Sequence, residues 1–228
     1  MEEDLITAVE EKKRIQALLS KKVRIVPVRM KFGSVAGVDA SFLNETVFAA
    51  ASFYRYPGMD HVEDAVFRGR AAFPYVPGLF AFREGPALMG ALKKLKIAPD
   101  LILIDGQGIA HPRGLGIASH IGVILGIPTI GCAKSRLIGK YEEPGPGRGS
   151  WTYLYPEAPS GDAVGAVVRT RNGVRPLFVS PGNLINIESS VEIVLRCTGV
   201  FRIPEPLRRA DMVCSQMRQK HSLKREDS

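Results

Sequence analysis

The chain has 228 residues, of which 45% are hydrophobic and 24% charged, and its net charge is +8. This length is enough for one domain with its own core, and the sequence shows no internal repeat and no low-complexity segment. The longest apolar run, residues 101–104, is far too short to span a membrane. A basic surface attracts polyanions such as nucleic acid, although many basic proteins bind none.

Cysteine usage indicates the compartment. The three cysteines, Cys132, Cys197 and Cys214, are odd in number and widely spaced, and none belongs to a CxxC pair. We therefore expect neither a zinc site nor a disulfide framework, and a reducing cytoplasm fits best. The acidic start at residues 2–4 does not match a secretory signal peptide, and no membrane partner is expected.

The first half of the chain predicts a helix, three strands and a second helix. Apolar residues at near-helical spacing predict a helix over 4–20. Stretches rich in Val, Ala and Phe predict the strands 34–42, 46–55 and 64–72. The segment FPYVPG at 73–78 cannot be helical because its two prolines hold the backbone extended. A helix is expected over about 84–96, with Pro86 near its first turn.

The second half alternates strands and helices. LILI at 101–104 is wholly apolar, which is typical of a central strand buried on both faces. After it we expect a helix over 115–125, a strand over 128–132, a loop over 142–150, strands near 151–155, 163–170 and 175–179, and helices near 184–197 and 205–219. This order predicts an antiparallel meander followed by a parallel crossover. The fold class is therefore α/β, a mixed sheet flanked by helices in a single domain over 1–228, with a frayed tail from about residue 220.

Two carboxylates follow or interrupt apolar strands. Asp39 lies inside VAGVDASF, and Asp105 ends the strand LILID. A carboxylate in such surroundings is costly to desolvate unless a cation or several donors meet it. A cap on loop amides would explain either residue alone, but two on separate strands favour a site for a hard cation such as Mg²⁺.

Four further residues are weaker candidates, since each has an ordinary explanation. Glu84 begins a predicted helix, where acids are favoured anyway. Lys134 follows a strand and could neutralise charge on a phosphate, or it could be a surface lysine. His111 lies in the glycine loop and could hold a phosphate or a metal-bound water. Asp211 on the last helix could be a surface acid paired with Arg208.

Two loops could contact a flat ligand. The loop at 106–108 lacks the spacing of a dinucleotide fingerprint and of a Walker A motif, so its glycines either allow close approach of a ligand or form a tight turn. Tyr75 stands between Pro74 and Pro77 on a stiff segment. Such an aromatic can wedge into a base stack beside an extruded nucleotide, and a buried loop aromatic is the equal alternative. His120 is expected to cap or to pack against the helix face.

Six segments together resemble the conserved blocks of the endonuclease V family, the deoxyinosine 3′ endonucleases. They are VAGVDASF, FPYVPGLFAFREGPAL, PDLILIDGQGIAHPRGLGIASHIGV, IPTIGCAKSRLIG, FVSPGN and RIPEP, in the order of the family. The resemblance covers most of the chain, from about residue 35 to 211. It implies a fold similar to ribonuclease H and a metal-dependent cut at the second phosphodiester bond 3′ to deoxyinosine, which leaves a 3′ hydroxyl and a 5′ phosphate.

The resemblance also implies roles for individual residues. The catalytic set would be Asp39, Glu84, Asp105, Lys134 and His111, and the metal ligands would be Asp39, Asp105, Glu84 and Asp211, although some relatives carry a histidine at the position of Asp211. The DNA-binding set would be Pro74, Tyr75, Pro77, Gly78, Leu79, Phe80, Gly106, Gly108, Gly116 and Ser180. The implied cofactor is Mg²⁺, with Mn²⁺ as a substitute, and the implied partner is deoxyinosine-containing DNA, with inosine in RNA left open.

Two other functions remain open from the residues alone. One is a different nuclease of the ribonuclease H superfamily that acts on hybrids or junctions, and the other is a nucleic-acid-binding protein without catalysis. The presence of Asp39, Glu84 and Asp105 argues against the second, and Tyr75 with its prolines argues against the first. A monomer is expected because the site needs no second chain.

Overall fold

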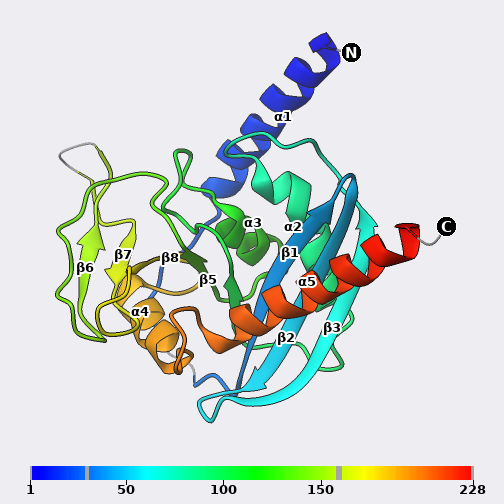
Figure 1. Ribbon diagram of the computed structural model, residues 1–228. Helices are drawn as coiled ribbons and strands as arrows, with labels where there is room; N and C mark the ends of the chain where they lie inside the picture. The colour runs from blue at the N-terminus through cyan, green and yellow to red at the C-terminus, as the bar shows by residue number, and fades with distance from the viewer. Residues whose placement is uncertain (1, 29–30, 158–160, 227–228) are drawn as a thin grey trace.

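The computed structural model describes residues 2–28, 31–157 and 161–226, and one eight-stranded sheet runs through this part of the chain (Figure 1). The strands are β1 Ser34–Leu43, β2 Thr46–Arg55, β3 Asp60–Arg70, β4 Ile102–Ile104, β5 Thr129–Ala133, β6 Trp151–Leu154, β7 Gly165–Val168 and β8 Leu177–Asn183. The helices are α1 Glu2–Ser20, α2 Phe80–Leu92, α3 Ile117–Leu125, α4 Ile187–Arg196 and α5 Glu205–Glu226.

The sheet is mixed, as the order of elements predicts. Its strand order is β3-β2-β1-β4-β5-β8-β7-β6. The first three strands form the expected antiparallel meander, and β4 pairs in parallel with β1 on one side and with β5 on the other. The short strand β4 is therefore central, and both of its faces are covered by helices. This position explains why its residues are all apolar.

Helices pack on both faces of the sheet. Ile102 and Ile104 of β4 face the apolar side chains of α2 and α3, whereas Leu103 between them faces α4 and the start of α5. Side chains alternate between the faces of a strand, so a run of three apolar residues contributes to two cores. In Figure 1, α5 crosses in front of β1 and β2, and α1 projects away from the rest of the molecule.

Helix α5 lies unusually close to β1. A Cβ atom on Gly37 would lie 2.2 Å from the backbone carbon of Pro206, so only glycine allows this approach. Farther along, the Cys214 thiol donates to the Asp39 carbonyl oxygen at 3.1 Å. Helix α5 is thereby packed directly against the strand that carries Asp39.

The predicted helix end near residue 219 is corrected, because α5 continues to Glu226. The ring of His221 lies 5.5 Å from that of Phe48, and its Nε2 lies 3.2 Å from Arg68 Nη2. These contacts hold the last turns of α5 against the meander. Residues 227–228 lie outside the described part of the chain.

Three predicted boundaries are also corrected. Helix α2 begins at Phe80 rather than 84 and ends at Leu92, so Pro86 lies inside the helix instead of in its first turn. Strand β3 covers 60–70 rather than 64–72, and β8 extends to Asn183 instead of ending at 179. Pro181 interrupts no pairing because the register with β5 shifts beside it. In the described residues we find no helix that is both long and apolar enough to cross a bilayer.

Candidate active site

The register of the central strands places Asp39 beside Asp105. Val38 on β1 pairs with Ile104 on β4, and the residue that follows each of them is an aspartate, Asp39 or Asp105. In parallel strands, residues at the same register point to the same side of the sheet, and neighbouring strands lie about 5 Å apart. The two carboxylates therefore meet where β4 ends.

Lys134 reaches the same point from β5. It follows Ala133, the last residue of that strand, and its Nζ lies 2.5 Å from Asp105 Oδ2. Burial alone would lower the pKa of Lys134, but the hydrogen bond and charge of Asp105 and the charge of Asp39 raise it. The lysine is thus held protonated beside the carboxylates.

Glu84 approaches from α2, on its second turn. Burial, and then the charge of Asp105, raise the pKa of Glu84 to about 7. The same two causes, in the same order, raise the pKa of Asp39 to about 8. Asp39, Glu84 and Asp105 therefore lie together at one end of the cavity, with Lys134 paired to Asp105. Raised pKa values, as found here for Asp39 and Glu84, are typical of a functional site.

This donor set fits a hard divalent cation. Within the described residues no three His, Cys, Asp or Glu side chains are spaced as a complete metal cage. Mg²⁺ does not need one, because it usually takes one or two carboxylates and completes its shell with water and substrate phosphate. Asp39 and Asp105 supply that pair, and a cation beside them would offset the repulsion that raises the pKa of Asp39.

Asp211 is close to these acids without lining the cavity. It is exposed on α5, and its charge contributes to the raised pKa values of both Asp39 and Lys134. Its predicted role as a metal ligand stays a prediction.

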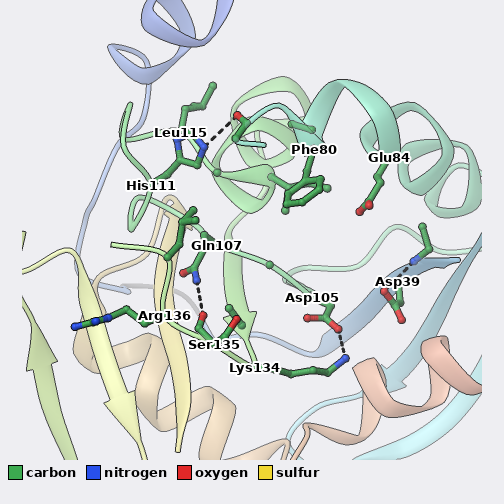
Figure 2. Close-up of a pocket in the computed structure, with 18 of the residues that line it drawn as sticks. Asp39, Phe80, Glu84, Asp105, Gln107, His111, Leu115, Lys134, Ser135 and Arg136 are labelled. Carbon is green, nitrogen blue, oxygen red and sulfur yellow. Dashed lines mark hydrogen bonds and ion pairs between the residues drawn. The ribbon is translucent and has the colours of Figure 1, made fainter. Parts of the chain in front are cut away.

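A cavity of about 410 Å³ joins the carboxylates to a wall of loop residues (Figure 2). Of the predicted site residues, those that line it are Asp39, Gly78, Phe80, Glu84, Asp105, Gly106, His111, Gly116 and Lys134. In Figure 2 the acids and Lys134 lie at one end, and His111 and Leu115 lie at the other. The cavity has the size of a small-molecule site and could hold one extruded base.

Three residues expected to contact DNA lie behind this wall. Ser180 is 1% exposed, and its hydroxyl accepts from the Gly108 N–H at 2.6 Å. A Cβ on Gly108 would lie 2.0 Å from the Pro181 carbonyl oxygen, so this glycine packs the loop against β8. Leu79 is buried at the residue before α2. None of the three lines the cavity, and their predicted contacts to DNA stay predictions.

The aromatic between the two prolines is exposed, so the alternative of a buried loop residue is wrong. Tyr75 is 64% exposed, and Pro74 and Pro77 beside it are exposed as well. The Tyr75 ring lies 5.3 Å from the ring of Phe80, which lines the cavity. A stiff, exposed aromatic beside the mouth of the cavity is suited to contact bases.

His111 supports the wall instead of facing the acids. Its Nε2 lies 3.2 Å from the Gly78 carbonyl oxygen, and its Nδ1 accepts from the Arg113 N–H at 3.2 Å. Burial, and then the charge of Arg113, lower the pKa of His111 to about 4. Both nitrogens of His111 are thus engaged with loop backbone, and its predicted catalytic role stays a prediction. His120 packs edge-on against the Phe82 ring of α2 at 5.0 Å, so of the two expected roles, capping or packing, the structure shows packing.

Two glutamines that the sequence analysis missed also line the cavity. Gln16 reaches it from α1, and Gln107 follows Gly106. The Gln107 amide nitrogen donates to the Ser135 carbonyl at 3.1 Å, while its Oε1 is buried and has no hydrogen-bond partner among the residues that the structure describes. The loop position of Gln107 was a signal for it, whereas nothing in the helical pattern of α1 distinguished Gln16.

Paired acids and a lysine at the ends of central strands, beside a base-sized cavity, define a phosphodiester-cleaving nuclease on a ribonuclease H-like sheet. A sequence profile described as Endonuclease V matches residues 17–212. The chain therefore belongs to the endonuclease V family, a family of metal-dependent nucleases.

Individual relatives agree over nearly the whole chain. Endonuclease V of Geotalea uraniireducens is 47% identical over 212 residues, which are 93% of this chain and 89% of the relative. The crystal structure of the Streptomyces avermitilis endonuclease V has 40% identity and a TM-score of 0.88, covering 93% of this chain and 94% of that one. The Ciona intestinalis endonuclease V, in complex with a 24mer DNA containing an inosine followed by a ribo-adenosine, has 27% identity and a TM-score of 0.83, covering 94% and 99%.

Proposed function

We propose that the protein hydrolyses the second phosphodiester bond 3′ to deoxyinosine in DNA and leaves a 3′ hydroxyl and a 5′ phosphate. The observation that carries this proposal is the single cavity that joins the acids Asp39, Glu84 and Asp105 to a wall of glycine backbone. One end is suited to the scissile phosphate and the other to a base. The DNA-bound Ciona relative supports inosine as that base.

Gln107 offers a physical basis for selecting the base. Its buried Oε1 is an acceptor without a partner. Hypoxanthine carries an N–H donor at N1, whereas adenine carries a lone pair there. An acceptor that is already desolvated gains a hydrogen bond from hypoxanthine and would face a second acceptor in adenine. Weaker pairing of a deaminated base also makes its extrusion from the duplex less costly.

The residues of this chain divide the work of hydrolysis. Asp39 and Asp105 would hold Mg²⁺, with Mn²⁺ as a substitute, and Glu84 and Asp211 would add to the negative charge around it. When bound, the ion supplies Lewis-acid polarisation of the phosphate and lowers the pKa of a water. Lys134, held protonated beside Asp105, stabilises the charge that develops on the phosphate oxygens. Tyr75 would occupy the gap left by the extruded base.

The proposal extends to RNA, assembly and location. Inosine in RNA is a second substrate, because the Ciona relative accommodates a ribonucleotide directly after the inosine. The site is built from one chain, so we propose a monomer. The three free cysteines fit the reducing cytoplasm.

Cleavage of an end-labelled duplex with one deoxyinosine tests the proposal. With Mg²⁺ we expect a single cut one nucleotide 3′ to the lesion by the wild type and none by Asp105→Asn. The matched control substrate has deoxyadenosine at the same position, and an RNA strand with inosine tests the second substrate. Cutting that ignores inosine would indicate another ribonuclease H-like nuclease, and binding without any cut would indicate a non-catalytic protein.

A further inference from the structure

Gln16 is the point at which helix α1 reaches the cavity. Its side chain is 1% exposed, although the next two residues of α1, Ala17 and Leu18, are exposed. Most of α1 projects away from the molecule, as Figure 1 shows. Burying an amide costs free energy unless its polar atoms are hydrogen-bonded, so the hydrogen-bond partners of Gln16 indicate its structural role.

Three side chains converge on one carbonyl oxygen, that of Gly78. Gln16 Nε2 donates to it at 2.9 Å, Arg113 Nη2 donates at 2.8 Å, and His111 Nε2 lies at 3.2 Å. Arg113 Nε also donates to Gln16 Oε1 at 2.5 Å. Because a guanidinium can only donate, this bond fixes the amide of Gln16 with its nitrogen toward Gly78.

The network connects two loops that meet at the end of the cavity opposite the acids (Figure 2). Gly78 ends the loop that carries Tyr75, and Arg113 belongs to the loop that follows Asp105. Gln16 Nε2 also approaches the Leu115 carbonyl oxygen at 3.4 Å, and both Gly78 and Leu115 line the cavity. Arg113 and His111 join the two loops directly at the Gly78 carbonyl, and Gln16 adds a contact from α1 to each loop.

We propose that Gln16 is a positioning residue that sets the width of the base pocket and so helps to select a 6-oxopurine over adenine. This inference rests on the proposed inosine-directed function. Gln16 lies just before the segment that matches the family profile, residues 17–212. It touches no reacting atom, and its effect passes through the backbone of Gly78 and Leu115.

Two substitutions separate the bonds of the amide. Gln16→Glu keeps an acceptor for Arg113 but removes the N–H donors to Gly78 and Leu115. Gln16→Leu removes both kinds of bond at similar volume. The matched control is Arg14→Gln, which lies exposed on the same helix and changes the net charge by the same amount as Gln16→Glu.

Binding and turnover are measured separately. Without divalent metal, we expect the Kd for a deoxyinosine duplex to rise about tenfold in both Gln16 variants, as for the loss of one or two neutral hydrogen bonds. The Kd for the unmodified duplex should stay constant, because contacts to the phosphate backbone remain. With Mg²⁺, KM should rise by a similar factor while kcat changes less than about threefold, and the control should match the wild type.

A merely structural role would give a different pattern. It would lower the thermal midpoint and the active fraction, and it would leave the ratio of the two Kd values unchanged. An unchanged ratio in both Gln16 variants, with a wild type that prefers deoxyinosine, would overturn this inference alone. A wild type that neither prefers nor cuts deoxyinosine would overturn the proposed function itself.

Discussion

The acid cluster makes the metal-free protein less stable at high pH, and Asp39→Asn should remove most of that effect. Burial and then Asp105 raise the pKa of Asp39 from 3.8 to about 8. In this range the folded protein binds a proton that the unfolded chain has released, so the free energy of unfolding falls as the pH rises toward 8. Asparagine has the same shape and carries no charge at any pH.

The effect of Asp39 on stability is clearest between pH 6.5 and pH 8. Burial lowers the pKa values of His111 and His120 from 6.5 to about 4, so below pH 6.5 these histidines oppose the effect of Asp39. Above pH 6.5, each pH unit changes the free energy of unfolding by at most about 1.4 kcal/mol per proton. Asp39 therefore contributes at most about 2 kcal/mol between pH 6.5 and 8. Glu84, with its pKa raised to about 7, adds a smaller loss of the same sign.

Urea unfolding in EDTA at pH 6.5 and pH 8 measures this difference. We expect the wild type to lose about 1 to 2 kcal/mol between the two values and Asp39→Asn to lose less than half of that. Saturating Mg²⁺ should stabilise the wild type at pH 8 and have little effect on the variant, since it binds only the folded state. The control is Asp162→Asn, at an exposed loop position, which should follow the wild type. Equal losses in wild type and Asp39→Asn would refute the raised pKa of Asp39.

Three further substitutions test single contacts. Lys134→Ala removes the donor 2.5 Å from Asp105, and single-turnover assays should show the rate falling about 100-fold or more with little change in binding. A rate within about threefold of the wild type would contradict the role of Lys134. Tyr75→Ala should change the free energy of unfolding by less than about 0.5 kcal/mol because the side chain is exposed. It should raise KM more for a duplex than for a single strand, and equal effects on the two substrates would argue against a wedge. Arg209→Ala breaks a pair with Asp64 at 2.7 Å and should cost about 1 to 2 kcal/mol in urea unfolding, whereas no loss would mean that the pair does not hold α5 on the sheet.

The sequence predicted the sheet well because its signals are local. The run LILI could only be buried on both faces, and the meander before it is separated by clear turn residues. The start of α2 was missed because proline is common in the first turn of a helix, so Pro86 suggested a start near residue 84. In the structure the helix begins one turn earlier, and packing of that turn outweighs the backbone hydrogen bond that Pro86 cannot donate. The length of α5 was missed because contacts of His221 with the meander join residues far apart in the chain.

The acids of the site were predictable and its wall was not. Asp39 and Asp105 stand out because a charge next to an apolar strand needs an explanation. The sequence did not show that Ser180 and Gly108, both predicted to contact DNA, form a hydrogen bond with each other, because they lie more than seventy residues apart. Gln16 carries no sequence signal, since its role depends on the position of a loop that begins almost sixty residues later.

One loop connects recognition to cleavage. It starts at Asp105, among the acids, and ends at Gly116, where α3 begins and the cavity wall closes. Its middle is fixed on one side by Ser180 of β8 and on the other by the network around the Gly78 carbonyl. A base held against this wall is therefore kept at a constant offset from the carboxylates. A cut at a fixed distance from the lesion follows from a short, doubly anchored loop and needs no separate measuring element.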